Sequence, residues 1–212
     1  MKTGKNVIIS AKEALLIETE IMSKLGLVYY PSEGLRQKCK KISSFDGSTR
    51  KLAQDMLETM YANNGVGLAA PQVGVNKRMM VIDVSSDEEP NKPIVFINPE
   101  IIDSTGEMVG NEGCLSFPGV FFEVRRASRI VVKFKNVSGK EQKLVAADNL
   151  LCRAIQHEID HLDGELFIDK AVSKLAADLE LSKHGFQGDS VEVPVSSSVH
   201  IQTTSDERQL VG

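Results

Sequence analysis

The segment from residue 148 to residue 162 constrains the fold of this chain more than any other part of the sequence. At the roughly 100° per residue of an α-helix, its large apolar side chains fall on one arc and most of its polar side chains on the opposite arc. The apolar arc comprises Leu151, Ile155, Ile159 and Leu162. The polar arc comprises Asn149, Arg153, Gln156 and Asp160. We therefore predict an amphipathic helix that begins at Asp148 as its N-cap and packs its apolar arc on a core.

Two of the four histidines of the chain lie in this helix, in the pattern His-Glu-x-x-His. Residues four apart on a helix share a face, so His157 and His161 can bind one metal ion with Glu158 beside it. Both histidines flank the apolar arc, and we expect them to point inward. The alternative is a pair of buried histidines with ordinary hydrogen-bond partners and a surface glutamate. The pattern favours the metal site.

The third ligand of such a metal is less obvious. A catalytic site usually takes three protein ligands and leaves a fourth position for water. Metzincins place a histidine ten residues after the first, but Phe167 stands there. Gluzincins use a downstream glutamate, for which Glu180 is the candidate, without an accompanying motif. The remaining candidate is Cys114, in the glycine-containing stretch 112–116, although a single cysteine in a loop is more often a small apolar residue.

A glycine-rich stretch, Gly65–Gly74, follows a predicted helix that contains Leu52, Met56 and Met60. It is not a phosphate-binding loop, because the Gly-Lys-Ser/Thr ending is absent. Such a stretch can be a tight crossover between a helix and a strand. It can equally let a substrate backbone approach closely, in which case Gln72 supplies a neutral hydrogen-bond donor.

These three stretches together resemble the motifs of the peptide deformylase family. The chain has Gly-Val-Gly-Leu-Ala-Ala-Pro-Gln at 65–72, Glu-Gly-Cys-Leu-Ser at 112–116 and Gln-His-Glu-Ile-Asp-His-Leu-Asp-Gly at 156–164. All three match the family's motifs in order and spacing. The resemblance extends over about residues 25 to 183, and the stretches before and after look longer than a compact member of that family needs.

The resemblance implies a metal-dependent hydrolase that removes the formyl group from the N-terminal methionine of newly made polypeptides and releases formate. The metal ligands that it implies are Cys114, His157 and His161. Water would be the fourth ligand, and Glu158 would carry the proton. Gln72 and the backbone N–H of Leu115 would stabilise the oxyanion of the tetrahedral intermediate.

The resemblance also suggests which metal and which pocket to expect. Ferrous iron is expected in the cell, with zinc, nickel or cobalt in purified protein, because two nitrogens and one sulfur suit several metals. For the methionine side chain, the family and the helical pattern suggest Val66, Leu115 and Ala154 as walls, with Gly65, Gly67 and Gly113 as room for the peptide backbone. Arg153 could lean over this cleft, although such an arginine is more often solvated.

Two other classes of protein stay open. An endopeptidase would use the same glutamate and water, but it needs an extended cleft and typically a metal bound by histidines, with or without a carboxylate. A non-catalytic metal module would need a fourth protein ligand, and the only spare thiols are Cys39 and Cys152. Cys152 lies five residues before His157, about 140° round the helix, and is expected to point away.

Composition excludes several further functions. The 212 residues carry a net charge of −4, so we expect neither a broad basic face nor nucleic acid as a direct substrate. No apolar run reaches the roughly 18 residues that span a bilayer, and residues 1–24 resemble neither a signal peptide nor an arginine-rich transit peptide. We expect a cytoplasmic protein without membrane contact, with an organelle left open. Its expected partners are formylated nascent peptides, with room for transient ribosome contact, and its expected state is a monomer or weak oligomer.

The remaining sequence predicts an α+β fold, with short antiparallel sheets packed around the helix that carries the His-Glu-x-x-His motif. Runs rich in Val, Ile and Phe at 79–84, 93–97, 120–124 and 130–134 predict the strands. Residues 1–24 are expected to be an extension with a short helix, and residues 25–185 the catalytic domain. Residues 186–212 are expected to be a poorly ordered tail without a core of its own.

Overall fold

The structure is a computed structural model, and it describes residues 24–86 and 90–186. Its helices are α2 (Gly47–Ala62), α3 (Leu150–Asp163) and α4 (Lys174–Lys183), with single 3₁₀ turns η1 (Glu33–Arg36), η2 (Ala70–Val73) and η3 (Phe167–Lys170). Its strands are β1 (Gly67–Ala69), β2 (Met79–Ile82), β3 (Ile94–Thr105), β4 (Met108–Cys114), β5 (Phe117–Arg126), β6 (Arg129–Lys135) and β7 (Glu141–Ala147). The predicted N-terminal helix and all but the first residue of the predicted tail lie outside the described residues.

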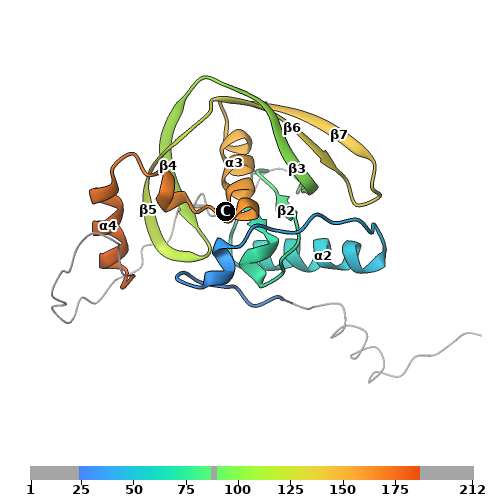
Figure 1. Ribbon diagram of the computed structural model, residues 1–212, viewed down its shortest axis with the longest axis horizontal. Coiled ribbons are helices and arrows are strands. Elements are labelled where there is room, and N and C mark those ends of the chain that lie inside the picture. Colours follow the sequence, from blue (N-terminus) through green and yellow to red (C-terminus); the bar gives the residue numbers. More distant parts are fainter. Residues whose placement is uncertain (1–23, 87–89, 187–212) are drawn as a thin grey trace, which may run out of the picture.

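The strands form two antiparallel sheets around α3 (Figure 1). One sheet has five strands in the order β1-β2-β3-β6-β7, and the other is the β4–β5 hairpin. In Figure 1, α3 stands between the hairpin and the larger sheet, while α2 crosses the base and α4 lies outside β5. The α+β prediction, with antiparallel sheets around the motif helix, is therefore confirmed.

Helix α2 forms where an N-cap residue precedes a run of apolar residues at helical spacing. The side chain of Asp46 caps its N-terminus by accepting hydrogen bonds from the backbone N–H groups of Ser48 and Thr49 at 2.9 and 3.1 Å. Ala53, Met56 and Met60 recur at helical spacing and are buried. They pack against β1 and β2, so the glycine-rich stretch, which contains β1, is held at the edge of the larger sheet next to α2.

The larger sheet turns one apolar face toward α3. In β6, residues 130, 132 and 134 are buried and alternate with half-exposed neighbours, as a strand with one covered face requires. Ile130, Val132 and Phe134 meet Phe96 and the apolar side of α3 in one cluster. This cluster fixes the position of the motif helix relative to the sheet.

Helix α3 differs from the sequence prediction in two respects. Its N-cap is Asn149, whose side chain accepts a hydrogen bond from the N–H of Cys152 at 2.8 Å, whereas Asp148 has left-handed backbone torsion angles just outside the helix. All residues from 152 to 162 are buried, including Arg153, Gln156 and Asp160 of the polar arc. The expectation that Arg153 is solvated is therefore wrong, because β4 and β5 cover that side of the helix with charged partners.

Three strands were not predicted. β1 is short and glycine-containing, β4 is rich in polar residues and glycine, and most of β7 is exposed. None of them shows the run of Val, Ile and Phe that indicates a strand in sequence. The hairpin is nevertheless packed on one side by aromatic rings, with Phe122 stacked on Phe167 at a centroid distance of 4.4 Å.

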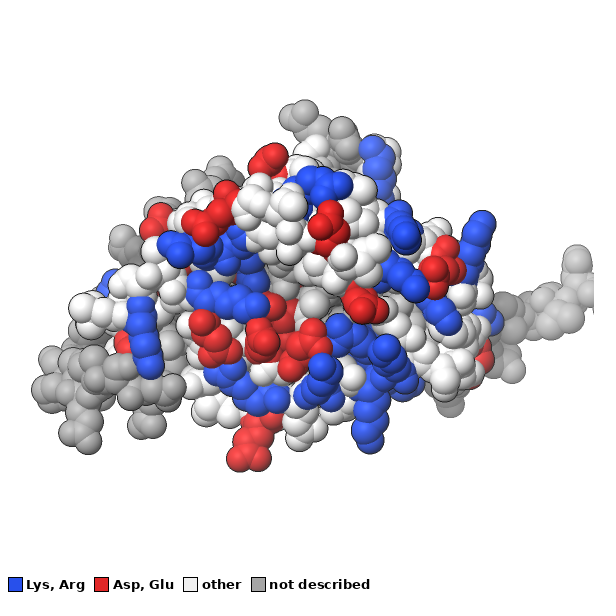
Figure 2. Space-filling model, turned by 45° about the horizontal axis from the view of Figure 1, so that its top comes forward, with Lys and Arg blue, Asp and Glu red and all other residues white. Residues whose placement is uncertain are grey.

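Charges on the surface are mixed. On the face shown in Figure 2, acidic side chains gather in the middle and are flanked by basic ones. In the part of the chain that the structure describes, no helix combines the length and the hydropathy needed to cross a bilayer.

Candidate metal centre

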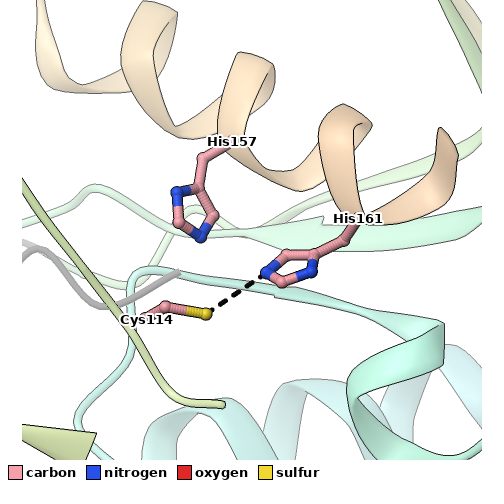
Figure 3. A group of neighbouring side chains, drawn as sticks. All are labelled: Cys114, His157 and His161. Carbon is pink, nitrogen blue, oxygen red and sulfur yellow. Dashed lines mark hydrogen bonds between the residues drawn. The ribbon is translucent and has the colours of Figure 1, made fainter. Parts of the chain in front are cut away.

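Three potential metal ligands come together from two elements. His157 and His161 project from consecutive turns of α3 toward Cys114 at the end of β4 (Figure 3). One ligand atom from each residue lies within 4.8 Å of the others, and the Sγ atom of Cys114 lies 3.2 Å from Nε2 of His161. All three side chains are buried. Within residues 24–86 and 90–186, no other group of His, Cys, Asp or Glu side chains has this arrangement.

Hydrogen bonding leaves the histidines suited to bind a metal. Nδ1 of His157 lies 2.9 Å from a carboxylate oxygen of Glu112, which makes Nδ1 the donor and leaves the lone pair on Nε2. Nε2 of His157 is buried and has no hydrogen-bond partner among the described residues. Burial lowers the pKa of His161 well below its ordinary value, and the positive charge of Arg126 acts in the same direction, so His161 is neutral. The donor set fits a divalent transition metal.

Glu112 is held as an anion behind His157. Burial by itself would raise its pKa, but hydrogen bonds from Arg126 and His157 hold the pKa well below the ordinary range. Arg126 donates to both carboxylate oxygens, at 2.8 and 2.7 Å, and also forms an ion pair with Asp160. Arg153 donates to the same carboxylate at 2.8 Å. The carboxylate behind His157 is therefore fixed by two arginines.

Glu158 follows His157 directly on α3 and is buried against Gly67 of β1. Its side chain is fully buried, and neither oxygen has a hydrogen-bond partner among the described residues. Burial raises its pKa to about 7. A Cβ atom on Gly67 would lie 2.5 Å from Oε1 of Glu158, so only glycine at this position of β1 leaves room for the carboxylate.

The structure places Gln72 and Leu115 next to the same centre. The side-chain carbonyl of Gln72 accepts a hydrogen bond from the N–H of Ala69 at 2.7 Å, which closes the glycine-rich loop. Its amide nitrogen lies 3.5 Å from Sγ of Cys114. Leu115 follows Cys114 directly, and its side chain is buried. Both residues are thus within reach of a group bound at the metal centre.

The predicted pocket residues have varied surroundings. Gly65 and Val66 are half-buried, and Ala154 is buried in the cluster between α3 and the larger sheet. The space beside Gly113 is taken by the ring of Phe121, whose Cε1 atom lies 2.2 Å from the position of a Cβ atom. Phe121 therefore excludes any side chain at residue 113.

A groove of about 250 Å³ opens beside Cys114. Its lining includes Tyr29, Leu115, Phe117 and Phe121. Of these four side chains, only that of Leu115 was predicted from the sequence. No sequence signal marks the others, because an aromatic residue ordinarily predicts core packing.

The alternative ligands lie elsewhere. Glu180 forms ion pairs with Lys183 at 2.9 Å and His184 at 3.3 Å. Cys39 and Cys152 are buried in the cluster between α3 and the larger sheet, and Cys152 is directed to backbone carbonyls of residues 127 and 128. The described residues therefore supply three ligands and no fourth, as in catalytic rather than structural sites.

A Cys-His-His donor set with an open position, beside a buried glutamate on the same helix, defines a metal-dependent hydrolase. The profile of the family described as Polypeptide deformylase matches residues 24–176. The chain belongs to the peptide deformylase family, whose members are metal-dependent hydrolases that remove the N-terminal formyl group from nascent peptides.

Individual relatives agree with this assignment. A peptide deformylase of Thermosynechococcus vestitus is 47% identical over 168 residues, covering 79% of this chain and 89% of that protein. A peptide deformylase of Thermodesulfovibrio yellowstonii is 51% identical over 158 residues, covering 74% and 94%. The crystal structure of a peptide deformylase from Synechococcus elongatus in complex with actinonin has a TM-score of 0.73 at 43% identity, covering 81% and 91%.

Proposed function

We propose that this chain removes the N-terminal formyl group from nascent peptides, with Glu158 carrying the proton. Cys114, His157 and His161 are the proposed ligands of one divalent metal. The observation that carries the proposal is the Glu158 carboxylate, which directly follows the ligand His157 on α3, is buried, and has no hydrogen-bond partner among the described residues. A carboxylate in that position has room to exchange a proton with water and substrate.

The proposed roles follow from the surroundings of each residue. Cys114, His157 and His161 would hold a divalent metal, which would supply Lewis-acid chemistry: it would lower the pKa of a bound water from 15.7 toward about 7 and polarise the formyl oxygen. Glu158, whose pKa is about 7, accepts a proton from the attacking water and passes it to the leaving nitrogen. Gln72 and the backbone N–H of Leu115 donate hydrogen bonds to the oxyanion of the tetrahedral intermediate. Formate and a free amino terminus are the products.

The substrate peptide is proposed to bind alongside β1 and β4. Gly65, Gly67 and Gly113 are proposed to leave room for its backbone, and Val66, Leu115 and Ala154 are the proposed walls for the methionine side chain. The groove beside Cys114 then continues the site, and its aromatic lining favours apolar side chains after the first methionine.

Ferrous iron is the proposed metal in the cell. Cys114 contributes a thiolate, and a thiolate beside iron is exposed to oxidation in air. Activity of the iron form should therefore decay in air, whereas the nickel form should persist. Equal aerobic half-lives of the two forms would contradict this choice of metal. We further propose cytoplasmic action on formylated nascent chains, as a monomer or weak oligomer with transient ribosome contact.

The decisive experiment replaces Glu158 by glutamine. The variant keeps the shape of the side chain but cannot accept the proton. Because general acid-base assistance contributes about 10²- to 10⁴-fold, turnover of a formyl-Met peptide should fall at least roughly a hundredfold with metal content unchanged. Glu123→Gln is the matched control, since Glu123 is exposed on β5 and its variant should keep parental turnover.

Two results would overturn the proposal. One is near-normal turnover of Glu158→Gln with metal bound. The other is cleavage of unformylated peptides by the parent protein at a rate similar to deformylation, which would favour an endopeptidase.

A further inference from the structure

Arg153 occupies an unusual place for a charged side chain. It lies on α3 one turn before His157, and it is only 6% exposed. A buried guanidinium is costly unless its donors are used. Among the described residues, its three hydrogen-bond acceptors all belong to the β4–β5 hairpin, which also carries Cys114.

The first acceptor is the carboxylate behind His157. Each oxygen of Glu112 receives two hydrogen bonds. Oε1 accepts from Nε of Arg126 at 2.8 Å and from Nη1 of Arg153 at 2.8 Å. Oε2 accepts from Nη2 of Arg126 at 2.7 Å and lies 2.9 Å from Nδ1 of His157. Arg153 therefore fills the last acceptor position of Oε1.

The other two acceptors are backbone carbonyls. Nη1 of Arg153 lies 3.1 Å from the carbonyl oxygen of Val124 on β5 and 3.4 Å from that of Gly110 on β4. A Cβ atom at residue 110 would lie 3.0 Å from Nη2, so glycine provides the space for the guanidinium. The hairpin thus fixes the guanidinium, which in turn restrains Glu112.

We propose that Arg153 is a positioning residue of the metal centre, acting on His157 through Glu112. The inference rests on the proposed ligand set. Two arginines hold the carboxylate in one orientation, and this carboxylate sets the ring orientation and tautomer of His157. Arg153 also connects α3, which carries the histidines, to the hairpin, which carries the cysteine. Without it, Glu112 would keep one arginine, and Oε1 would lose one of its two hydrogen bonds.

The test measures metal affinity rather than turnover. Ni²⁺ affinity of the parent protein and of Arg153→Met is determined by competition with a chromophoric chelator. Loss of a group that orients a ligand typically lowers metal affinity by about 10- to 100-fold, and we expect this loss for Arg153→Met. Arg125→Met is the matched control. Arg125 is an exposed neighbour on β5 that pairs with Glu107 at 3.2 Å, so its variant should keep parental affinity.

A double-variant cycle separates a positioning role from general loosening of the structure. If Arg153 acts through Glu112, adding Arg153→Met to a Glu112→Gln protein should lower Ni²⁺ affinity by less than about twofold. Fully additive losses would overturn the inference, as would parental affinity in Arg153→Met. If Arg153→Met does not fold, Arg153→Lys takes its place, and an affinity within about twofold of the parent then overturns it. Failure of the parent protein to bind Ni²⁺ would instead overturn the proposed ligand set.

Discussion

The two sides of α3 are equally buried but are held by different forces. Toward the larger sheet, Cys152, Ile155 and Ile159 pack against apolar residues of β2, β3 and β6. Toward the β4–β5 hairpin, Arg153 and Asp160 take part in ion pairs with residues of the hairpin strands. We call these the sheet side and the hairpin side. Burial alone therefore does not tell a core from a functional site in this protein.

The difference has a physical consequence. Apolar contacts are not directional, and a small change in shape costs only the contacts that are lost. A buried ion pair is directional, and removing one partner leaves an uncompensated charge. Substitutions on the hairpin side should therefore have larger effects than matched substitutions on the sheet side.

Replacing cysteine on each side should give the largest contrast. Cys114→Ala removes a ligand, so bound metal should fall below about a tenth of the parental content and deformylation with it. Cys152→Ala, on the sheet side, should keep metal and cost about 1 kcal/mol of stability. Metal content by elemental analysis and unfolding in urea measure the two effects. Full metal occupancy in Cys114→Ala would show that the ligand set is wrong.

The next contrast concerns arginine. Arg126→Met leaves Glu112 and Asp160 buried without their shared partner, which should lower the free energy of unfolding by about 3–5 kcal/mol. Arg129 forms an exposed pair with Asp103, and Arg129→Met should cost no more than about 1 kcal/mol. Urea unfolding of both variants gives the comparison. Similar losses in the two variants would mean that the hairpin side does not depend on charge pairing.

The sequence was most informative on the sheet side. The spacing of Ile155, Ile159 and Leu162 predicted a helix with one face on a core, and the spacing of His157 and His161 predicted that both rings share a direction. These features are local, because they depend only on the geometry of one helix. The strands rich in Val, Ile and Phe were also predicted from local information, because the composition of one short run is enough to indicate a strand.

The hairpin side could not be predicted from the sequence in this way. A polar arc on a helix indicates solvent unless its partners are known, and the partners of Arg153 and Asp160 are 41 and 34 residues away in the chain. Glu112 belongs to the 112–116 motif, so the sequence predicts that it lies near Cys114. Its contact with His157 could not be predicted. Arg126 carried no signal, because an arginine near the end of a strand ordinarily faces solvent.

A third contrast compares two glycines, one packed against Glu158 and one with open space beside it. Gly67 on β1 faces Glu158, and Gly67→Ala should displace the carboxylate because its Cβ would lie 2.5 Å from Oε1. We expect turnover to fall by about tenfold or more, within the range of general acid-base assistance, with metal retained. Gly47→Ala is the control, since nothing lies within 4 Å of its Cβ position at the start of α2. Parental turnover in Gly67→Ala would show that the reaction does not depend on the exact position of the Glu158 carboxylate.

The smallest effect is expected on the sheet side itself. Ile155 is fully buried among apolar side chains of α3 and the larger sheet, and Ile155→Val removes one methylene group without introducing a polar atom. The expected cost is about 0.5–1.5 kcal/mol in urea unfolding, with metal affinity and turnover unchanged. This residue lies only two positions before His157, so distance along the helix does not explain the mild result; the direction of the side chain does. A loss of metal affinity in Ile155→Val comparable to that in Arg153→Met would show that the two sides of α3 are mechanically coupled, and the distinction between them would then fail.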